Sequence, residues 1–111
     1  MKPYCNMPET TDYEQVMTLL VSYAGDANAL VYDALDAYAE GDLNKTYELL
    51  DQADKQLTTA HSYQFQLMSA EANNEDVHTS ILLIHAMDIC MNAANSIMYT
   101  RKLISVFESK K

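Results

Sequence analysis

The sequence predicts an all-α fold, an antiparallel bundle of three long helices. Glycine and proline occur only twice each among 111 residues, so few turns interrupt the chain. Over long stretches, apolar residues recur at steps of three and four, which is the spacing of one helix face. Two short polar breaks divide these stretches, at Gly41-Asp42 and at Asn73-Asn74. Together these observations indicate three helices in one domain.

The first helix is expected after a short tail. Residues 1–10 contain both prolines, and we expect a flexible tail there, ahead of a single domain over residues 11–111. Thr11 and Glu14 have the spacing of a capping box, in which hydroxyl and carboxylate satisfy backbone donors at a helix start. Gly25 either weakens this helix locally or admits a neighbouring backbone. The apolar face comprises Val16, Leu19, Leu20, Tyr23, Ala27, Leu30, Val31, Ala34, Leu35 and Tyr38.

The second helix is predicted between the two polar breaks. Gly41 suits the left-handed residue that ends a helix, and Asp42 is a good N-cap for the next. Asn73-Asn74 ends the second helix, since asparagine tolerates left-handed geometry. One face carries Leu43, Tyr47, Leu50, Ala53, Leu57, Ala60, His61, Gln64, Leu67 and Met68.

The third helix is predicted from about Asp76 to Glu108. Its N-terminal end is acidic and its C-terminal end carries cations, as the helix dipole favours. Between Ile81 and Met91 it is apolar nearly all round. Two other helices cannot fully surround such a helix, so we expect it to pack against copies of itself.

The acidic composition excludes some partners. The net charge is −9, and Lys45 and Lys55 are the only cations between Met7 and Tyr99. Such a surface repels phosphodiester backbones, so we expect no binding to nucleic acid. It attracts a basic protein partner, or it serves solubility alone.

The sequence also predicts a cytoplasmic location. The chain does not begin with an apolar signal segment. We expect no membrane insertion, because His85 and Asp88 interrupt the longest apolar stretch and leave it too short to span a bilayer. In the reducing cytosol, Cys5 and Cys90 are expected to be free thiols.

A line of polar residues runs through the apolar third helix. His85 and Asp88 lie three residues apart, and Asn92, Asn95 and Tyr99 continue on the same side. An imidazole can attack phosphorus near neutral pH, and phosphoryl transfer then demands mostly positioning and charge stabilisation. The alternative is a core histidine whose hydrogen bonding Asp88 satisfies. Copies of Asp88 that converge on a symmetry axis need a metal ion or shared protons.

Other candidate residues are less informative. His61 lies one turn before Gln64 and either contacts the region of His85 or is a hydrogen-bonded structural residue. His78, beside the acidic turn, is expected to be solvated. Cys90 is expected in the core, because no basic residue near it in sequence lowers its pKa. There is no glycine-rich phosphate loop, Ser-His-Asp signature or zinc-ligand spacing.

Several of these features, at these spacings, resemble the lactose/cellobiose (N,N′-diacetylchitobiose) enzyme IIA family of the phosphotransferase system. The resemblance covers roughly Leu19 to Glu108. In the first two helices the matching patterns are Gly-x-Ala at Gly25 and Ala27, Ala34-Leu35, Gly41-Asp42, and Ala-His-x-x-Gln at Ala60 to Gln64. In the third helix, the family's His-Ala-Gln-Asp-His-Leu-Met-Thr is similar to His85-Ala86-Met87-Asp88-Ile89-Cys90-Met91-Asn92.

The resemblance implies a homotrimer of three-helix subunits that acts as a phosphotransferase. It implies that His85 accepts a phosphoryl group from the histidine-containing phosphocarrier protein and passes it to a cysteine of enzyme IIB. This relay accompanies uptake of a lactose-, cellobiose- or chitobiose-type sugar. It also implies that Asp88 lies on the trimer axis and meets a divalent metal, Mg²⁺. We expect His61, Gln64 and Asn92 as supporting residues.

The chain departs from the family pattern at three positions. Ile89 replaces the family's second histidine, Met87 replaces its glutamine, and Asn28 stands where arginine is common. These changes leave open a diverged structural or regulatory trimer of the same fold that lacks phosphotransfer. An isolated metal-binding bundle is disfavoured, because Asp88 is the only carboxylate within the core of the third helix.

Overall fold

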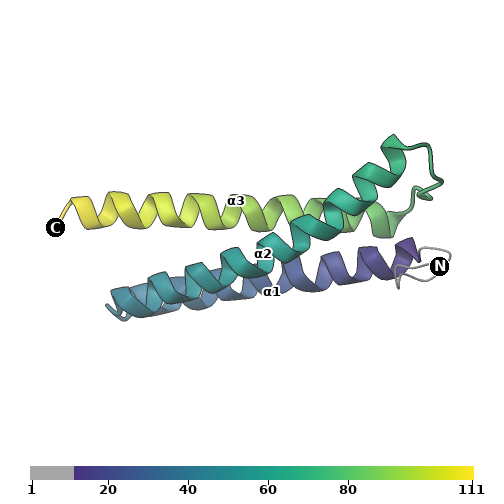
Figure 1. The fold of residues 1–111 in the computed structure, drawn as a ribbon. Helices are drawn as coiled ribbons and strands as arrows, with labels where there is room; N and C mark the ends of the chain where they lie inside the picture. Colours follow the sequence, from purple (N-terminus) through teal and green to yellow (C-terminus); the bar gives the residue numbers. More distant parts are fainter. Residues whose placement is uncertain (1–11) are drawn as a thin grey trace.

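The computed structural model describes residues 12–111 and contains three helices in that range, α1 (Tyr13–Ala39), α2 (Leu43–Ala72) and α3 (Ile81–Ser109). Figure 1 shows that α2 runs opposite to α1 and α3 along one long axis. The principal extents are 56 × 23 × 19 Å. The predicted antiparallel three-helix fold is therefore confirmed. The tail predicted over residues 1–10, together with Thr11 and Cys5, lies outside the described residues.

The helix boundaries follow from local caps. Asp12 is the N-cap of α1 and accepts a hydrogen bond from the backbone N–H of Gln15 at 3.1 Å. The cap is thus one residue later than the capping box predicted at Thr11. At the first break, Gly41 has a φ of 84° and Asp42 caps α2, as predicted. At the second break, Asn74 has a φ of 63°, which is the predicted left-handed geometry.

The predicted start of the third helix was wrong by five residues. The helix begins at Ile81 instead of Asp76, and Ser80 caps it by accepting from the backbone N–H of Leu83 at 3.1 Å. Val77 packs into the core from the non-helical segment ahead of α3. A hydrogen bond from the Tyr13 hydroxyl to Glu75 further ties this segment to α1. These contacts hold a non-helical connection where the acidic residues alone favoured a helix start.

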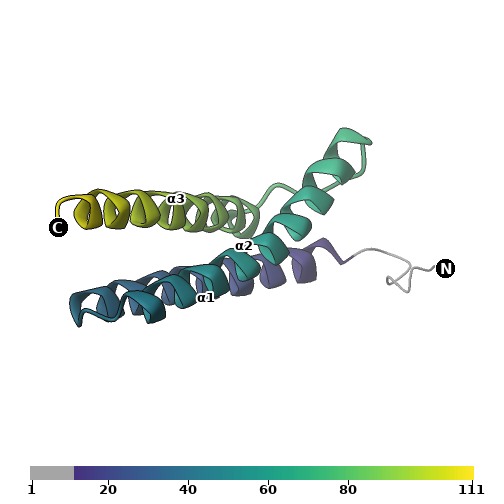
Figure 2. The same ribbon diagram turned by 60° about the vertical axis from the view of Figure 1, so that its left-hand side comes forward.

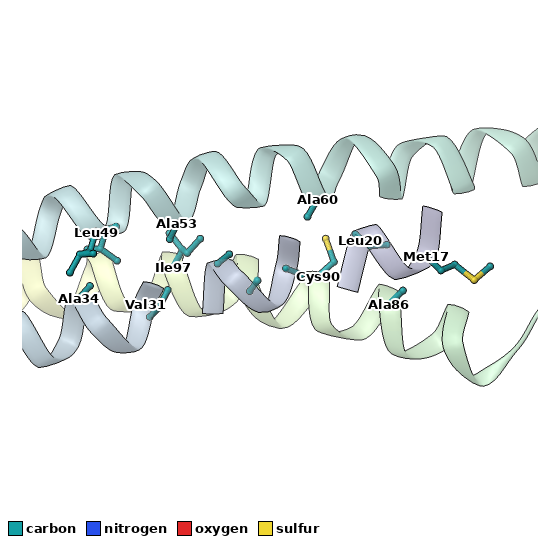
Figure 3. Close-up of a cluster of buried hydrophobic side chains, with 14 of the residues drawn as sticks. Met17, Leu20, Val31, Ala34, Leu49, Ala53, Ala60, Ala86, Cys90 and Ile97 are labelled. Atoms are coloured by element: carbon teal, nitrogen blue, oxygen red, sulfur yellow. The ribbon is translucent and has the colours of Figure 1, made fainter. Parts of the chain in front are cut away.

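The core is built largely from small side chains, which allow close packing of helices. Figure 3 shows Cys90 of α3 pointing toward Ala60 of α2, and both are fully buried. Gly25 does not admit another backbone, since no heavy atom of another element in residues 12–111 lies within 4 Å of a Cβ placed there. The alternative of a close approach is therefore wrong, and α1 continues through this residue. The buried alanines are Ala24, Ala27, Ala34, Ala37, Ala53, Ala60, Ala70, Ala86 and Ala93.

The three helices do not contact each other equally. The contact of α1 with α2 is the most extensive, and that of α2 with α3 the smallest. Both ribbon views show the C-terminal part of α2 turning away from α1 (Figures 1 and 2). Arg101 of α3 ties the two least connected helices together through Asp51 and Asp54 of α2. Among residues 12–111, one side of α3 consequently stays uncovered.

The uncovered helix corrects one sequence-based expectation. Within the described residues, α3 is the one helix long and apolar enough to cross a membrane by length and composition. The prediction that no apolar stretch has the required length was therefore wrong. The apolar run continues past His85 and Asp88 because few charges follow them. A helix that packs against protein can have the same length and composition.

Candidate functional site

Helix α3 carries two opposite faces with different environments. The face toward α1 and α2 is buried at Ala86, Cys90, Ala93, Ile97, Thr100 and Ile104. The opposite face exposes large apolar side chains, namely Ile81 (86%), Ile84 (61%), Met91 (54%), Met98 (61%) and Tyr99 (65%). Exposed apolar side chains that gather on one helix face are typical of interaction sites. The candidate site lies on this face.

His85 is exposed at the N-terminal end of this face, in the second turn of α3. Within residues 12–111, its side chain makes no hydrogen bond or ion pair, with Asp88 or with any other residue. The alternative of a core histidine satisfied by Asp88 is therefore wrong. The imidazole is available to a partner protein on a helix that holds its backbone rigidly.

The polar residues predicted to share a side of α3 with His85 are exposed together with it. Asp88, Asn92, Asn95 and Tyr99 are all exposed, and they follow His85 along the helix. A single chain thus presents an imidazole, one carboxylate and two amides among apolar neighbours. The exposed apolar residues between them were not recognised from the sequence as a separate face. The signal for them was the alternating spacing of three and four from Ile81 to Met98.

The neighbouring helix contributes Gln64 to this region. Gln64 Nε2 donates a hydrogen bond to Met87 Sδ at 3.7 Å, two residues beyond His85. His61, one turn earlier on α2, is exposed and makes no hydrogen bond within the part of the chain that the structure describes. The alternative in which His61 is a hydrogen-bonded structural residue is therefore wrong. Gln64 is the polar side chain through which α2 meets this part of α3.

The remaining candidates have the predicted surroundings. His78 is exposed. Cys90 is a free thiol that is completely buried, and desolvation by burial raises its pKa. A raised pKa lowers the thiolate fraction, which is the reactive form. Cys90 therefore belongs to the core and has no nucleophilic role.

A single chain does not assemble a metal site in the described range. Among residues 12–111, no three His, Cys, Asp or Glu side chains gather closely enough to hold an ion. A metal-binding property of the isolated chain is thus without support. Asp88 offers one exposed carboxylate, and oxygen ligands of this type are those that Mg²⁺ prefers. Several copies would have to meet to complete a site.

Comparison with known proteins assigns the family. The family model described as "PTS system, Lactose/Cellobiose specific IIA subunit" matches residues 14–108. The chain belongs to this family. The resemblance found in the sequence is therefore confirmed. Members of the family are phosphotransferase components of sugar transport systems, and this IIA chain is such a component.

Individual relatives agree with this assignment. The IIA chain is 37% identical over 92 residues to the lactose-specific EIIA component of Lacticaseibacillus casei, covering 83% of this chain and 82% of the relative. It is 29% identical over 110 residues to the N,N'-diacetylchitobiose-specific EIIA component of Escherichia coli K12, covering 96% and 95%. The crystal structure of a cellobiose-specific enzyme IIA from Bacillus anthracis superposes with a TM-score of 0.84 at 29% identity, covering 90% of this chain and 92% of that one.

Proposed function

We propose that this chain carries a phosphoryl group on His85 between two proteins of a sugar phosphotransferase system. The donor is the histidine-containing phosphocarrier protein, and the acceptor is a cysteine of enzyme IIB. The transported sugar belongs to the lactose, cellobiose and chitobiose class, which the names of the relatives span. The observation that carries the proposal is the imidazole of His85, which is exposed on the outer face of α3 and has no hydrogen-bond partner within residues 12–111.

Exposure alone does not single out His85. His61 and His78 are exposed as well. His85 differs from them in standing at the position of the family's phosphorylated histidine, three residues before Asp88. It also lies within a regular helix, in the second turn of α3, so its backbone does not need to be ordered during transfer. Positioning of this kind is most of what phosphoryl transfer requires of a protein.

The relay consists of two displacements at phosphorus. In the first, a ring nitrogen of His85 attacks the phosphorus of the donor's phosphohistidine. A new N–P bond forms while the donor's N–P bond breaks, and the donor imidazole leaves with the electron pair. In the second, a deprotonated cysteine of enzyme IIB attacks the same phosphorus. An S–P bond forms, and the N–P bond to His85 breaks to regenerate the free imidazole.

The uncovered face of α3 supports assembly into a homotrimer. Three copies that meet along this face would bury the exposed isoleucine and methionine side chains. They would also bring three Asp88 carboxylates together, and like charges at close range need neutralisation. A divalent cation, Mg²⁺, fits this all-oxygen set of ligands. In this proposal the ion neutralises the carboxylates of the assembly and takes no part in the transfer at His85.

The same face argues for a cytoplasmic location in place of insertion into a membrane. His85, Asp88, Asn92 and Asn95 all lie on it. Ionisable and amide side chains are costly when they face lipid. A protein partner can satisfy these groups, whereas hydrocarbon cannot. We therefore assign the apolar surface of α3 to contact with protein.

Phosphorylation in vitro tests the carrier proposal. The purified protein is incubated with phosphoenolpyruvate, enzyme I and the histidine-containing phosphocarrier protein, and its intact mass is measured. We expect an acid-labile gain of one phosphoryl group in the wild type, in His61→Ala and in His78→Ala. We expect no gain in His85→Ala.

A different phosphorylation result would favour the alternative function, a structural or regulatory trimer without phosphotransfer. If the carrier protein is phosphorylated and the folded wild-type chain gains nothing, phosphotransfer from this donor is excluded. The departures at Met87, Ile89 and Asn28 would then be the reason to regard the chain as a structural or regulatory trimer. A gain that persists in His85→Ala would move the acceptor to another residue.

A further inference from the structure

The uncovered face of α3 has the spacing of a coiled-coil seam. Its exposed residues alternate at steps of three and four, which is the pattern through which helices interlock side chains. The buried residues on the opposite side follow the same alternation, so α3 has one seam for its own chain and one left over. We call the left-over set the outer seam, and it consists of Ile81, Ile84, Asp88, Met91, Asn95, Met98 and Lys102.

Polar and apolar residues alternate along the outer seam. The outer seam consists of two positions that each recur every seven residues. One position is always apolar and holds Ile84, Met91 and Met98. The other position begins at Ile81 and is polar from there on, with Asp88, Asn95 and Lys102. When helices pack in parallel and in register, each layer contains copies of one residue, so polar meets polar. When they pack antiparallel, the two kinds of position face each other and every polar residue meets an apolar one.

Asn95 is the polar residue that this difference affects most. It is exposed between Met91 and Met98, and its side chain makes no hydrogen bond within residues 12–111. An amide both donates and accepts, so copies of Asn95 can satisfy each other without an ion. The like charges at Asp88 and Lys102 cannot do so. An Asn95 amide buried against methionine would lose its hydrogen bonds to water without replacement.

We propose that Asn95 selects the parallel arrangement of α3 helices when copies of this chain associate. The partner is a second copy of the same chain, because only an identical amide at the same level satisfies Asn95 in both roles. The inference rests on the self-association in the proposed function. Asn95 alone would then determine whether α3 helices pack parallel or antiparallel. The polar side chain in the seam lowers the stability of the assembly to some extent.

The test combines sedimentation with a cross-linking reporter. Ser105 is exposed at the next outer-seam position after Lys102, so Ser105→Cys reports on neighbouring copies that run in the same direction. Cys5→Ser removes the only other thiol besides buried Cys90. Oligomeric state is measured by sedimentation velocity, and disulfide-linked pairs are measured after mild oxidation. Asn95→Leu is introduced into this background, and Asn44→Leu, an exposed asparagine on α2, is the matched control.

We expect one trimeric species and efficient cross-linking in the parent and in Asn44→Leu. In Asn95→Leu, association persists but several species appear, and cross-linking falls by about half because antiparallel packing is no longer penalised. A single trimer with undiminished cross-linking in Asn95→Leu would overturn the role of Asn95 alone. A monomeric parent would overturn the self-association as well. Phosphorylation of His85 in the same samples shows whether the carrier proposal stands independently.

Discussion

Gln64 of α2 and Met87 of α3 are joined by an N–H···S hydrogen bond, with 3.7 Å between Nε2 and Sδ. This contact is the nearest polar link between the second helix and the segment that carries His85. It also explains how the helices meet at a position where the family pattern has glutamine and this chain has methionine. Gln64 therefore contacts α3 through the side chain of Met87.

Replacing Gln64 tests whether its role is to position α3. Gln64→Leu keeps the volume and removes one weak hydrogen bond, so we expect a loss of about 1 kcal/mol or less in the free energy of unfolding. The rate of His85 phosphorylation should fall by less than about tenfold, since a larger loss would require direct stabilisation of the transition state. Urea denaturation and single-turnover phosphorylation measure the two effects. A fall of several orders of magnitude with unchanged stability would place Gln64 at the reacting phosphoryl group.

Replacing Arg101 tests the link between α2 and α3. Arg101 lies 2.9 Å from Asp51 and 2.5 Å from Asp54, all measured between side-chain nitrogen and oxygen. These groups are partly exposed, so we expect Arg101→Met to cost about 0.5–1 kcal/mol of unfolding free energy. The loss should shrink in high salt, because salt screens exposed ion pairs.

Lys55→Met on α2 is the control for that measurement, because Lys55 is exposed and makes no ion pair within residues 12–111. Both variants are unfolded in urea at the same protein concentration, at low and at high salt. Equal effects of the two substitutions would show that the Arg101 ion pairs contribute nothing beyond general charge.

Lowering the pH should loosen the C-terminal end of α3. Hydrogen bonds from Lys111 first, and from Tyr38 second, lower the pKa of Glu108. The Tyr38 hydroxyl lies 2.6 Å from Glu108 Oε2 and joins α1 to α3. The lowered pKa means that ionised Glu108 stabilises the fold at pH values above the ordinary glutamate pKa of about 4.3. This stabilisation is lost as the pH falls through the lowered pKa.

Amide hydrogen exchange over the last turns of α3 measures this loosening. We expect protection there to fall toward acid in the wild type, after correction for the intrinsic rate, before the rest of the bundle unfolds. In Tyr38→Phe the fall should begin at higher pH, because the carboxyl pKa is less depressed. Identical pH profiles for the two proteins would refute a role for the hydrogen bond between Tyr38 and Glu108.

Most of the fold was predictable because the residues that start and end its helices act locally. Gly41 and Asn74 adopt left-handed geometry as their residue types suggest, and Asp42 caps the next helix. The start of α3 was missed because the acidic residues near position 76 outweighed Ser80, a good N-cap directly before Ile81. The burial of Val77 holds the connection ahead of α3 in a non-helical form, and this tertiary contact has no local signal in the sequence.

The site was less predictable, because it depends on which side of α3 the chain covers. A helix that is apolar nearly all round has no visible inner face in the sequence. The structure shows that Ala86 and Cys90 point inward, so His85 and Asp88 lie outward. On α2, His61 is exposed as well, although a hydrogen-bonded structural role was one of its two predicted alternatives. The spacing of the outer seam was present in the sequence but was hidden among equally apolar neighbours.

Onward transfer from the phosphorylated chain tests the central claim most directly. The chain is phosphorylated, separated from its donor, and mixed with enzyme IIB or with an enzyme IIB variant whose active-site cysteine is replaced by serine. We predict that this chain loses its phosphoryl group as the cysteine of intact enzyme IIB gains one, and that the serine variant gains none. A phosphoryl group that stays on His85 in the presence of intact enzyme IIB would contradict a carrier function.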